Sequence, residues 1–171
     1  MKRPESVEFP EYFNKYINLI VGDNILKVME DQIIDFQELI SSFTEENEDF
    51  VYAPAKWTPK EEIGHIIDTE RIMAYRALCF ARKDKTPLPG YDDMEYVKNA
   101  RFNSRTLYDL AHEFAVVRES NLALFKRLDK EALDEVGVAN GKSISVRATL
   151  FFIAGHTLHH INVIRAKYLI P

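Results

Sequence analysis

Apolar side chains recur every three or four residues in four long stretches of the chain. In the first stretch, from about residue 24 to 43, the repeating positions are Ile25, Met29, Ile33, Phe36, Ile40 and Phe43. An α-helix completes one turn in 3.6 residues, so this spacing places the apolar side chains on one helix face. The other stretches run from about 58 to 82, from 104 to 128, and from 143 or 145 to 168. Four helices of this length predict an all-α fold, a four-helix bundle.

The second stretch begins with the clearest helix start in the sequence. Thr58 can cap the helix, Pro59 suits the first helical position, and Glu61 can complete a capping box. Two prolines and a glycine between residues 83 and 93 stop the helix. The sequence therefore predicts a helix that ends near residue 82 and a loop that follows it.

Two smaller elements accompany the four helices. Residues 10–21 are aromatic and apolar, and they predict a short extra helix packed across the end of the bundle. The pair Asn140-Gly141 is a tight-turn signal between two short stretches that can pair as strands. We therefore expect a small hairpin just before the last helix.

Composition fits one globular domain over residues 1–171. Hydrophobic residues make up 46% of the chain and charged residues 29%, which argues against a disordered or fibrous protein. With only 6 glycines and 7 prolines, a turn-rich all-β fold is disfavoured. No internal repeat or composition break marks a second domain.

The charge pattern and the apolar runs bear on partners and location. The formal net charge is −5 and no basic stripe is present, which argues against nucleic acid as a partner. No apolar run is long enough to cross a bilayer, and no secretory signal is recognisable, so we expect no membrane association. The single cysteine, Cys79, fits a reducing compartment. The expected location is the cytoplasm.

Three of the five histidines lie close together in the fourth stretch. His156 and His160 are four residues apart, so their rings share one face of the predicted helix and can point at a single cation. His159 competes with His160, because an i, i+3 pair also shares a face. A third ligand has to come from another helix, and His65 is the candidate. Imidazoles suit one divalent transition metal such as Zn, Ni or Fe.

A metal-free interpretation of these histidines is also available. A lone histidine on an apolar face is usually a core residue bonded to a carbonyl or hydroxyl, and for His65 alone this interpretation is favoured. For His156 with His160 the balance reverses, because two buried imidazoles without a metal need two separate polar partners. Three neutral imidazoles leave coordination positions free, which is typical of a reactive site.

The chain resembles the DinB family, the DinB/YfiT-like metalloenzymes, from about residue 24 onward. The motifs that carry the resemblance are Lys56-Trp57-Thr58-Pro59-Lys60-Glu61, Gly64-His65-Ile66-Ile67-Asp68 and Gly155-His156-Thr157-Leu158-His159-His160. The resemblance implies a four-helix bundle with up-up-down-down connectivity. It also implies a metal held by His65, His156 and His160, because the His-x-x-x-His motif of the family selects His160 over His159. Relatives include S-transferases and isomerases that use low-molecular-weight thiols such as bacillithiol or mycothiol, and related bundles often form homodimers.

The leading hypothesis is a metal-dependent transferase or hydrolase that acts on a small molecule. Asp68, one turn after His65, is the candidate catalytic residue: it either orients an imidazole or acts as a general base. The alternative, of equal weight, is a helix-surface acid paired with Arg71 or Arg76. Arg76, Arg118 and Tyr75 are the candidate substrate-binding residues. For Arg118, which interrupts an apolar face, a protein carboxylate such as Asp68 or Glu113 is the alternative partner.

Two competing functions use the same bundle. A non-catalytic sensor or dimeric scaffold can bury the metal, whereas an enzyme needs it reachable through a pocket, which we expect under the loop at residues 83–103. A metal-free structural bundle is the third alternative.

Overall fold

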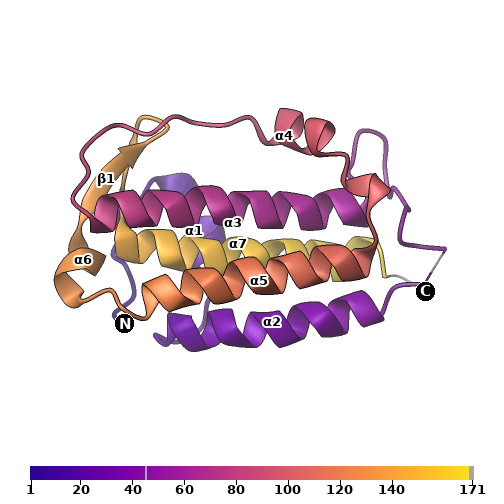
Figure 1. Cartoon of the computed structure of the whole chain (residues 1–171), viewed down its shortest axis with the longest axis horizontal. Coiled ribbons are helices and arrows are strands. Elements are labelled where there is room, and N and C mark those ends of the chain that lie inside the picture. The colour runs from indigo at the N-terminus through magenta and orange to yellow at the C-terminus, as the bar shows by residue number, and fades with distance from the viewer. Residues whose placement is uncertain (45, 170–171) are drawn as a thin grey trace.

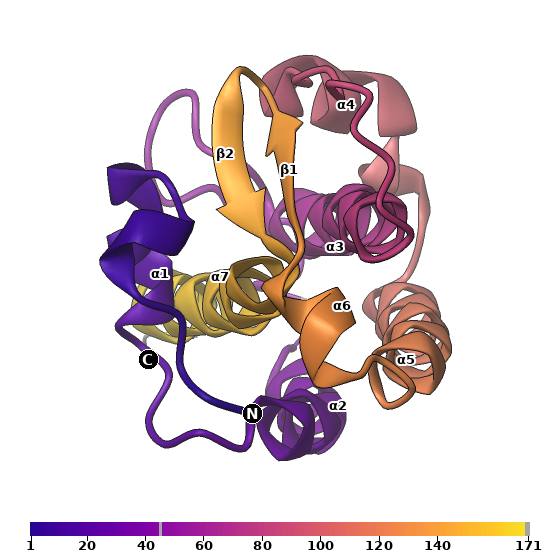
Figure 2. The ribbon, with the colours of Figure 1, turned by 90° about the vertical axis from the view of Figure 1, so that its left-hand side faces the viewer.

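The computed structural model describes residues 1–44 and 46–169. The four long helices are α2 (Ile25–Ser41), α3 (Pro59–Ala81), α5 (Leu107–Phe125) and α7 (Val146–Lys167). They lie side by side along the long axis of the molecule (Figure 1), and the end view shows them at the corners of one bundle (Figure 2). The predicted four-helix bundle is confirmed, with helix bounds within a few residues of those expected.

The helix directions correct the expected connectivity. Figure 1 shows α2 and α7 running one way and α3 and α5 the other, so the order is up-down-down-up rather than up-up-down-down. The parallel pair α3 and α5 is joined by a segment, residues 82–106, that returns along the whole bundle. An up-up-down-down bundle needs two such long returns. Here α2 and α3 are antiparallel and are joined at one end of the bundle. The helices α5 and α7 are also antiparallel and are joined at the other end.

Side-chain caps fix where the long helices begin. Thr58 accepts a hydrogen bond from the backbone N–H of Glu61, whose side chain accepts one from the backbone N–H of Thr58, so the predicted capping box is present. Thr106 caps α5 and Ser145 caps α7 in the same way. These caps satisfy backbone N–H groups that the first helical turn leaves free.

Four short elements were not expected. They are η1 (Ser6–Glu8), α4 (Asp93–Ala100), η3 (Phe102–Ser104) and α6 (Lys130–Asp134). The α4 helix corrects the expected loop after α3: Asp92 caps it, and Arg101 ends it in the left-handed region at φ 56°. Val97 is its one buried side chain. A helix with so small an apolar face has no periodic signal in the sequence.

The N-terminal segment and the hairpin cover one side of the bundle. Both elements were predicted, but the short helix was expected across the end of the bundle and instead lies along α7. The short helices η2 (Glu11–Phe13) and α1 (Asn14–Ile17) lie along α7 (Figure 2). A Cβ at Gly155 would come within 2.3 Å of the Tyr16 carbonyl oxygen, so glycine permits this close approach. Strands β1 (Val136–Ala139) and β2 (Lys142–Ser145) pair as an antiparallel hairpin.

A polar layer divides the core. One apolar cluster includes Met29 and Met73, and the other includes Phe36 and Phe114. Between them along the four helices lie Gln32, Glu70, Arg118, His156 and Thr157, all buried. No helix of the described residues is both long and apolar enough to span a bilayer.

Candidate metal centre

Two antiparallel helices bring three histidines together. His65 comes from α3, and His156 and His160 come from successive turns of α7. All three side chains are buried. One ligand nitrogen from each lies within 4.8 Å of the others, so the imidazoles predicted as ligands converge on a common point.

The spacing of these nitrogens fits a metal ion. Nε2 of His65 and Nε2 of His156 are 3.1 Å apart. Two nitrogens bound at about 2.0–2.1 Å to a tetrahedral ion would be about 3.3 Å apart. Borderline imidazole ligands suit Zn, Ni or Fe, and the donor set itself does not select among them.

A carboxylate that was not predicted from the sequence holds one of the rings. Nδ1 of His160 lies 2.6 Å from Oε2 of Glu62, a buried residue one turn before His65 on α3. When the carboxylate accepts the Nδ1–H, the lone pair of that imidazole is left on Nε2. The signal available in the sequence was the i, i+3 spacing of Glu62 and His65, which places both on one side of α3.

Burial disfavours the charged form of two of these histidines, His65 and His156. It lowers the pKa of His65 to about 3, with the neighbouring His160 adding to the effect, and it lowers the pKa of His156 well below its usual value. Neutral imidazoles keep the lone pairs that a metal requires. The third histidine of α7, His159, instead packs against the edge of the Tyr16 ring.

A cavity of about 210 Å³ reaches His65 and His156. Its other walls come from the N-terminal segment, α3, the segment after α3, the hairpin and α7. These residues are Tyr12, Phe13, Tyr16, Thr69, Met73, Arg76, Tyr91, Asp93, Asn140 and Phe152. Tyr91 and Asp93 belong to the segment at residues 83–103, under which a pocket was predicted.

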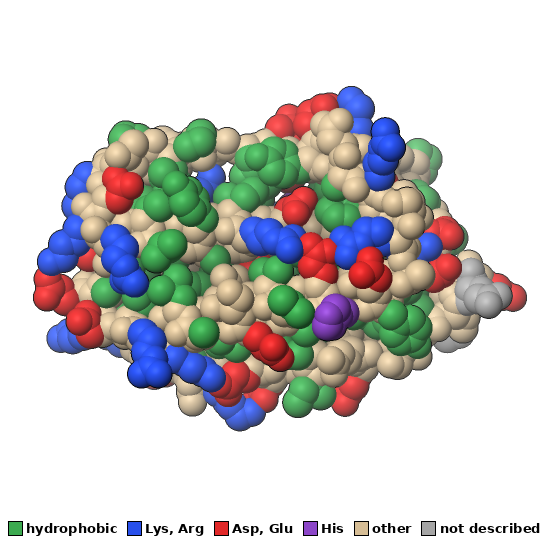
Figure 3. All heavy atoms as spheres, in the orientation of Figure 1, with side chains coloured by type: hydrophobic (Ala, Val, Ile, Leu, Met, Phe, Trp, Pro, Cys, Tyr) green, Lys and Arg blue, Asp and Glu red, His purple; other side chains and the backbone are tan. Residues whose placement is uncertain are grey.

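Two of the candidate substrate-binding residues, Arg76 and Tyr75, differ in exposure. Arg76 is buried and lines the cavity beside the histidines, whereas Tyr75 is 59% exposed. Tyr75 lines a second, mainly apolar hollow of about 310 Å³, and Arg76 and Tyr91 form a wall common to both. The space-filling view shows the surface hollowed beneath the segment that crosses above α3 (Figure 3).

Arg118 is fully buried and held by the protein itself. Its Nε and Nη2 donate to the two carboxylate oxygens of Glu70 at 2.7 and 2.8 Å, and Nη1 donates to Gln32 at 2.7 Å. Nη2 also donates to Thr157. The expected protein partner, Asp68 or Glu113, is therefore corrected to Glu70, and Arg118 does not line the cavity that reaches His65 and His156.

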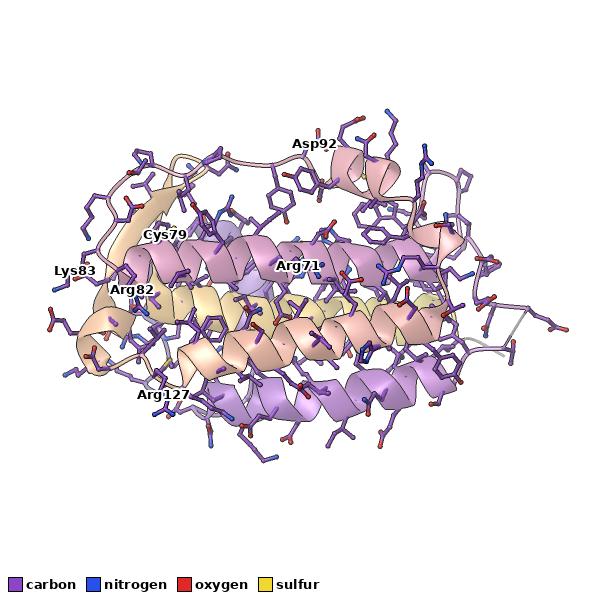
Figure 4. All side chains as sticks on the ribbon, in the orientation of Figure 1. Arg71, Cys79, Arg82, Lys83, Asp92 and Arg127 are labelled. Carbon is purple, nitrogen blue, oxygen red and sulfur yellow. The ribbon has the colours of Figure 1, made fainter. Side chains whose placement is uncertain are left out.

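Asp68 faces a surface charge cluster instead of the histidines. Its nearest cation is Arg71, at 3.9 Å, and Arg71 also pairs with Glu113 of α5. Figure 4 labels Arg71 midway along α3 and Cys79 nearer the end of that helix. Burial raises the pKa of Asp68, while Arg71 opposes this effect. The contact with an imidazole that was predicted for Asp68 is made by Glu62.

Fold and site define a class: a helical bundle with three buried histidines beside a cavity. The chain belongs to the DinB superfamily, whose family model matches residues 29–164. Among curated proteins no sequence match was found.

Solved structures share the fold. YfiT from Bacillus subtilis, described as a probable metal-dependent hydrolase with an unusual four-helix bundle topology, superposes with a TM-score of 0.76 at 17% identity, covering 96% of this chain and 90% of its own. A mycothiol-dependent maleylpyruvate isomerase gives 0.67 at 11% identity, covering 85% and 61%. YjoA, a DinB-like protein of Bacillus subtilis, gives 0.59 at 18% identity, covering 84% and 88%. At these identities the likeness concerns the fold.

Proposed function

We propose that this protein is a metal-dependent enzyme that acts on a small molecule in the cavity beside His65 and His156. The observation that carries the proposal is that convergent imidazoles lie at the wall of a cavity rather than inside a closed core. A structural metal site would have no need of such a cavity, whereas a reactive site requires one.

Each residue of the cluster has a proposed task. His65, His156 and His160 hold the metal, and Glu62 orients His160 by accepting its Nδ1–H. A divalent ion bound there would act as a Lewis acid. It would lower the pKa of a bound water or thiol, so that hydroxide or thiolate is available at neutral pH. The surrounding aromatic rings, including Tyr16 and Phe152, exclude bulk water from this point.

The reaction is proposed to be thiol-dependent S-transfer or hydrolysis. Two structural neighbours support these reaction classes by their descriptions, a mycothiol-dependent isomerase and a probable metal-dependent hydrolase. The volume of about 210 Å³ suits a small molecule rather than a polymer. A homodimer and a cytoplasmic location remain predictions from the sequence.

The competing function is a bundle that binds a metal or ligand without turnover. A sensor of this kind can use the same three histidines, and only turnover separates it from an enzyme. The polar side chains on the cavity wall, Arg76 and Asn140 among them, favour the enzyme because they can orient a substrate next to the histidines.

Metal analysis of untagged protein tests the proposal first. Wild type is expected to bind one equivalent of metal, and the double variant His156→Ala, His160→Ala none. His159→Ala and His112→Ala are matched controls, since both lie outside the cluster and are expected to keep the metal. Equal metal content in wild type and the double variant contradicts the metal site.

An activity screen follows with the best-bound metal. Thiol transfer to small electrophiles and hydrolysis of small amides are measured for wild type and for Glu62→Gln. Turnover that disappears on metal removal supports the enzyme. Stoichiometric metal without turnover of either substrate class supports the non-catalytic bundle.

A further inference from the structure

In the part of the chain that the structure describes, two arginines are buried, and one of them has an anionic protein partner. Arg118 is held by both carboxylate oxygens of Glu70. Arg76 is 8% exposed, and within the described residues no carboxylate forms an ion pair with it. Leaving a buried charge without a counter-ion is costly, so a buried arginine normally faces an anion.

The protein contacts of Arg76 leave most of its donors free. Nη2 donates to the Pro89 carbonyl at 2.8 Å, and Nη1 lies 3.2 Å from the Met73 sulfur, a weak acceptor. Its guanidinium also lies 5.9 Å from the centre of the Tyr91 ring. None of these groups carries a negative charge at neutral pH, and Arg76 borders the cavity that reaches the histidines.

We propose that Arg76 binds a carboxylate of the substrate and thereby selects small carboxylic acids. This inference rests on the proposed function, because it assigns a substrate class to the same cavity. The planar guanidinium fork matches a carboxylate in a way that a lysine cannot. A singly charged group is favoured over phosphate, since Asp93 lines the same cavity and would repel a second negative charge.

The position of Arg76 on α3 sets the length of the substrate. It lies eleven residues after His65, which corresponds to roughly 16 Å along the helix axis. Nη1 of Arg76 lies 3.2 Å from the sulfur of Met73, one turn nearer to His65, so the guanidinium reaches back along α3. The carboxylate and the reacting atom are therefore separated by less than this helix length of roughly 16 Å, and a six-carbon chain is the first length to test.

A purely structural role for Arg76 makes a different prediction. In that case the contact with Pro89 would only tether the segment that crosses above α3. Removing the guanidinium would then lower stability and weaken charged and neutral ligands to the same extent.

Matched thiols separate these roles. The dissociation constants of 6-mercaptohexanoate and 6-mercaptohexanol are measured by calorimetry with zinc-loaded wild type, Arg76→Gln and Arg76→Lys. We expect wild type to bind the acid at least tenfold more tightly than the alcohol. In Arg76→Gln this difference should disappear, while the dissociation constant of the alcohol stays within about twofold of wild type. Arg76→Lys should keep part of the difference. The control Arg71→Gln, on the exposed side of α3, behaves as wild type.

A metal-free arm separates this inference from the proposed function. Hexanoate and hexanol are titrated against metal-free protein and followed by NMR shifts. If metal-free wild type prefers hexanoate and Arg76→Gln does not, the inference is supported. If zinc adds nothing to thiol binding, only the metal-dependent function is contradicted. Equal binding of acid and alcohol by wild type in both arms overturns the inference, as does a preference that survives in Arg76→Gln. The wild-type comparison stands even when a variant fails to fold.

Discussion

Two polar clusters lie in the same middle layer of this bundle, and they differ in one respect. Around Arg118 of α5, the other three long helices supply partners until every strong donor is used: Met29 and Gln32 from α2, Glu70 from α3, and Thr157 from α7. Around His65 and His156, two ring nitrogens face each other across 3.1 Å, and a cavity adjoins them.

The difference teaches which buried polar groups to associate with function. A cluster whose donors and acceptors satisfy one another is complete, and its contribution is to hold the four helices in register. A cluster of one kind of donor atom, with lone pairs directed at a common point, is complete only when something else binds there. Both clusters consist of buried polar side chains. They differ in whether the protein itself supplies a hydrogen-bond partner for every donor and acceptor.

The largest effect is expected from breaking the Arg118 cluster. Replacing Glu70 by Ala leaves the guanidinium buried without its anion, and should lower the free energy of unfolding by about 3–5 kcal/mol. Urea denaturation of metal-free protein measures this loss. The control Glu113→Ala breaks partly exposed ion pairs and should cost about 1 kcal/mol or less. Equal losses for the two variants would mean that the first cluster is no more important than a surface pair.

The histidine cluster should respond to metal rather than to truncation. Zinc at about one hundred times its dissociation constant should raise the free energy of unfolding of wild type by about 2.7 kcal/mol, because it binds the folded state. The same zinc concentration should leave His156→Ala unchanged. Thermal unfolding with and without zinc measures both. An equal zinc response in wild type and His156→Ala would place the ion elsewhere.

A smaller effect distinguishes the two carboxylates near His65. Glu62→Gln should weaken zinc binding by about 10–100-fold, because Glu62 orients His160. Asp68→Asn is the matched control and should change zinc affinity by less than about threefold, since Asp68 faces Arg71. Competition with a chelating dye measures both constants. The reverse order would restore Asp68 to the role first predicted for it.

The smallest effect concerns pH. Burial lowers the pKa of His65 to about 3 in the folded protein, whereas an unfolded chain has a value near 6.5. Below pH 6.5 the unfolded state therefore binds a proton that the folded state does not, and stability falls as pH falls toward 3. Between pH 7.5 and 5.5 this residue should account for about 1.4 kcal/mol of lost stability.

Metal-free wild type and His65→Gln are compared for this purpose by urea denaturation at both pH values. The variant should lose less stability than wild type over this range. Parallel losses would show that His65 keeps an ordinary pKa in the folded protein.

The sequence predicted those parts of the fold that local chemistry determines. Caps such as Thr58 and the apolar spacing located the long helices, and Asn140-Gly141 located the hairpin. The α4 helix has one buried side chain, Val97, and so no periodic signal. The helix directions implied by the family resemblance were wrong. They depend on the path of the segment between α3 and α5, which neither periodicity nor composition indicates.

In the site too, spacing within one helix could be predicted from the sequence, whereas contacts between helices could not. The spacing of His156 and His160 is visible in sequence, but the choice between Glu62 and Asp68 depends on helix pairing. The two carboxylates lie one turn before and one turn after His65, on opposite flanks. Because α7 runs against α3, the step from His156 to His160 leads back toward Glu62. The partner of Arg118, Glu70, likewise required knowing which helix faces α5.

X-ray absorption spectroscopy of zinc-loaded protein tests the central claim most directly, because it counts the imidazoles bound to the ion. The account predicts three nitrogen ligands at about 2.0–2.1 Å in wild type. His65→Ala should show two and His159→Ala three. Fewer than three imidazoles in wild type, or an unchanged count in His65→Ala, would contradict the convergence of α3 and α7 on one metal ion.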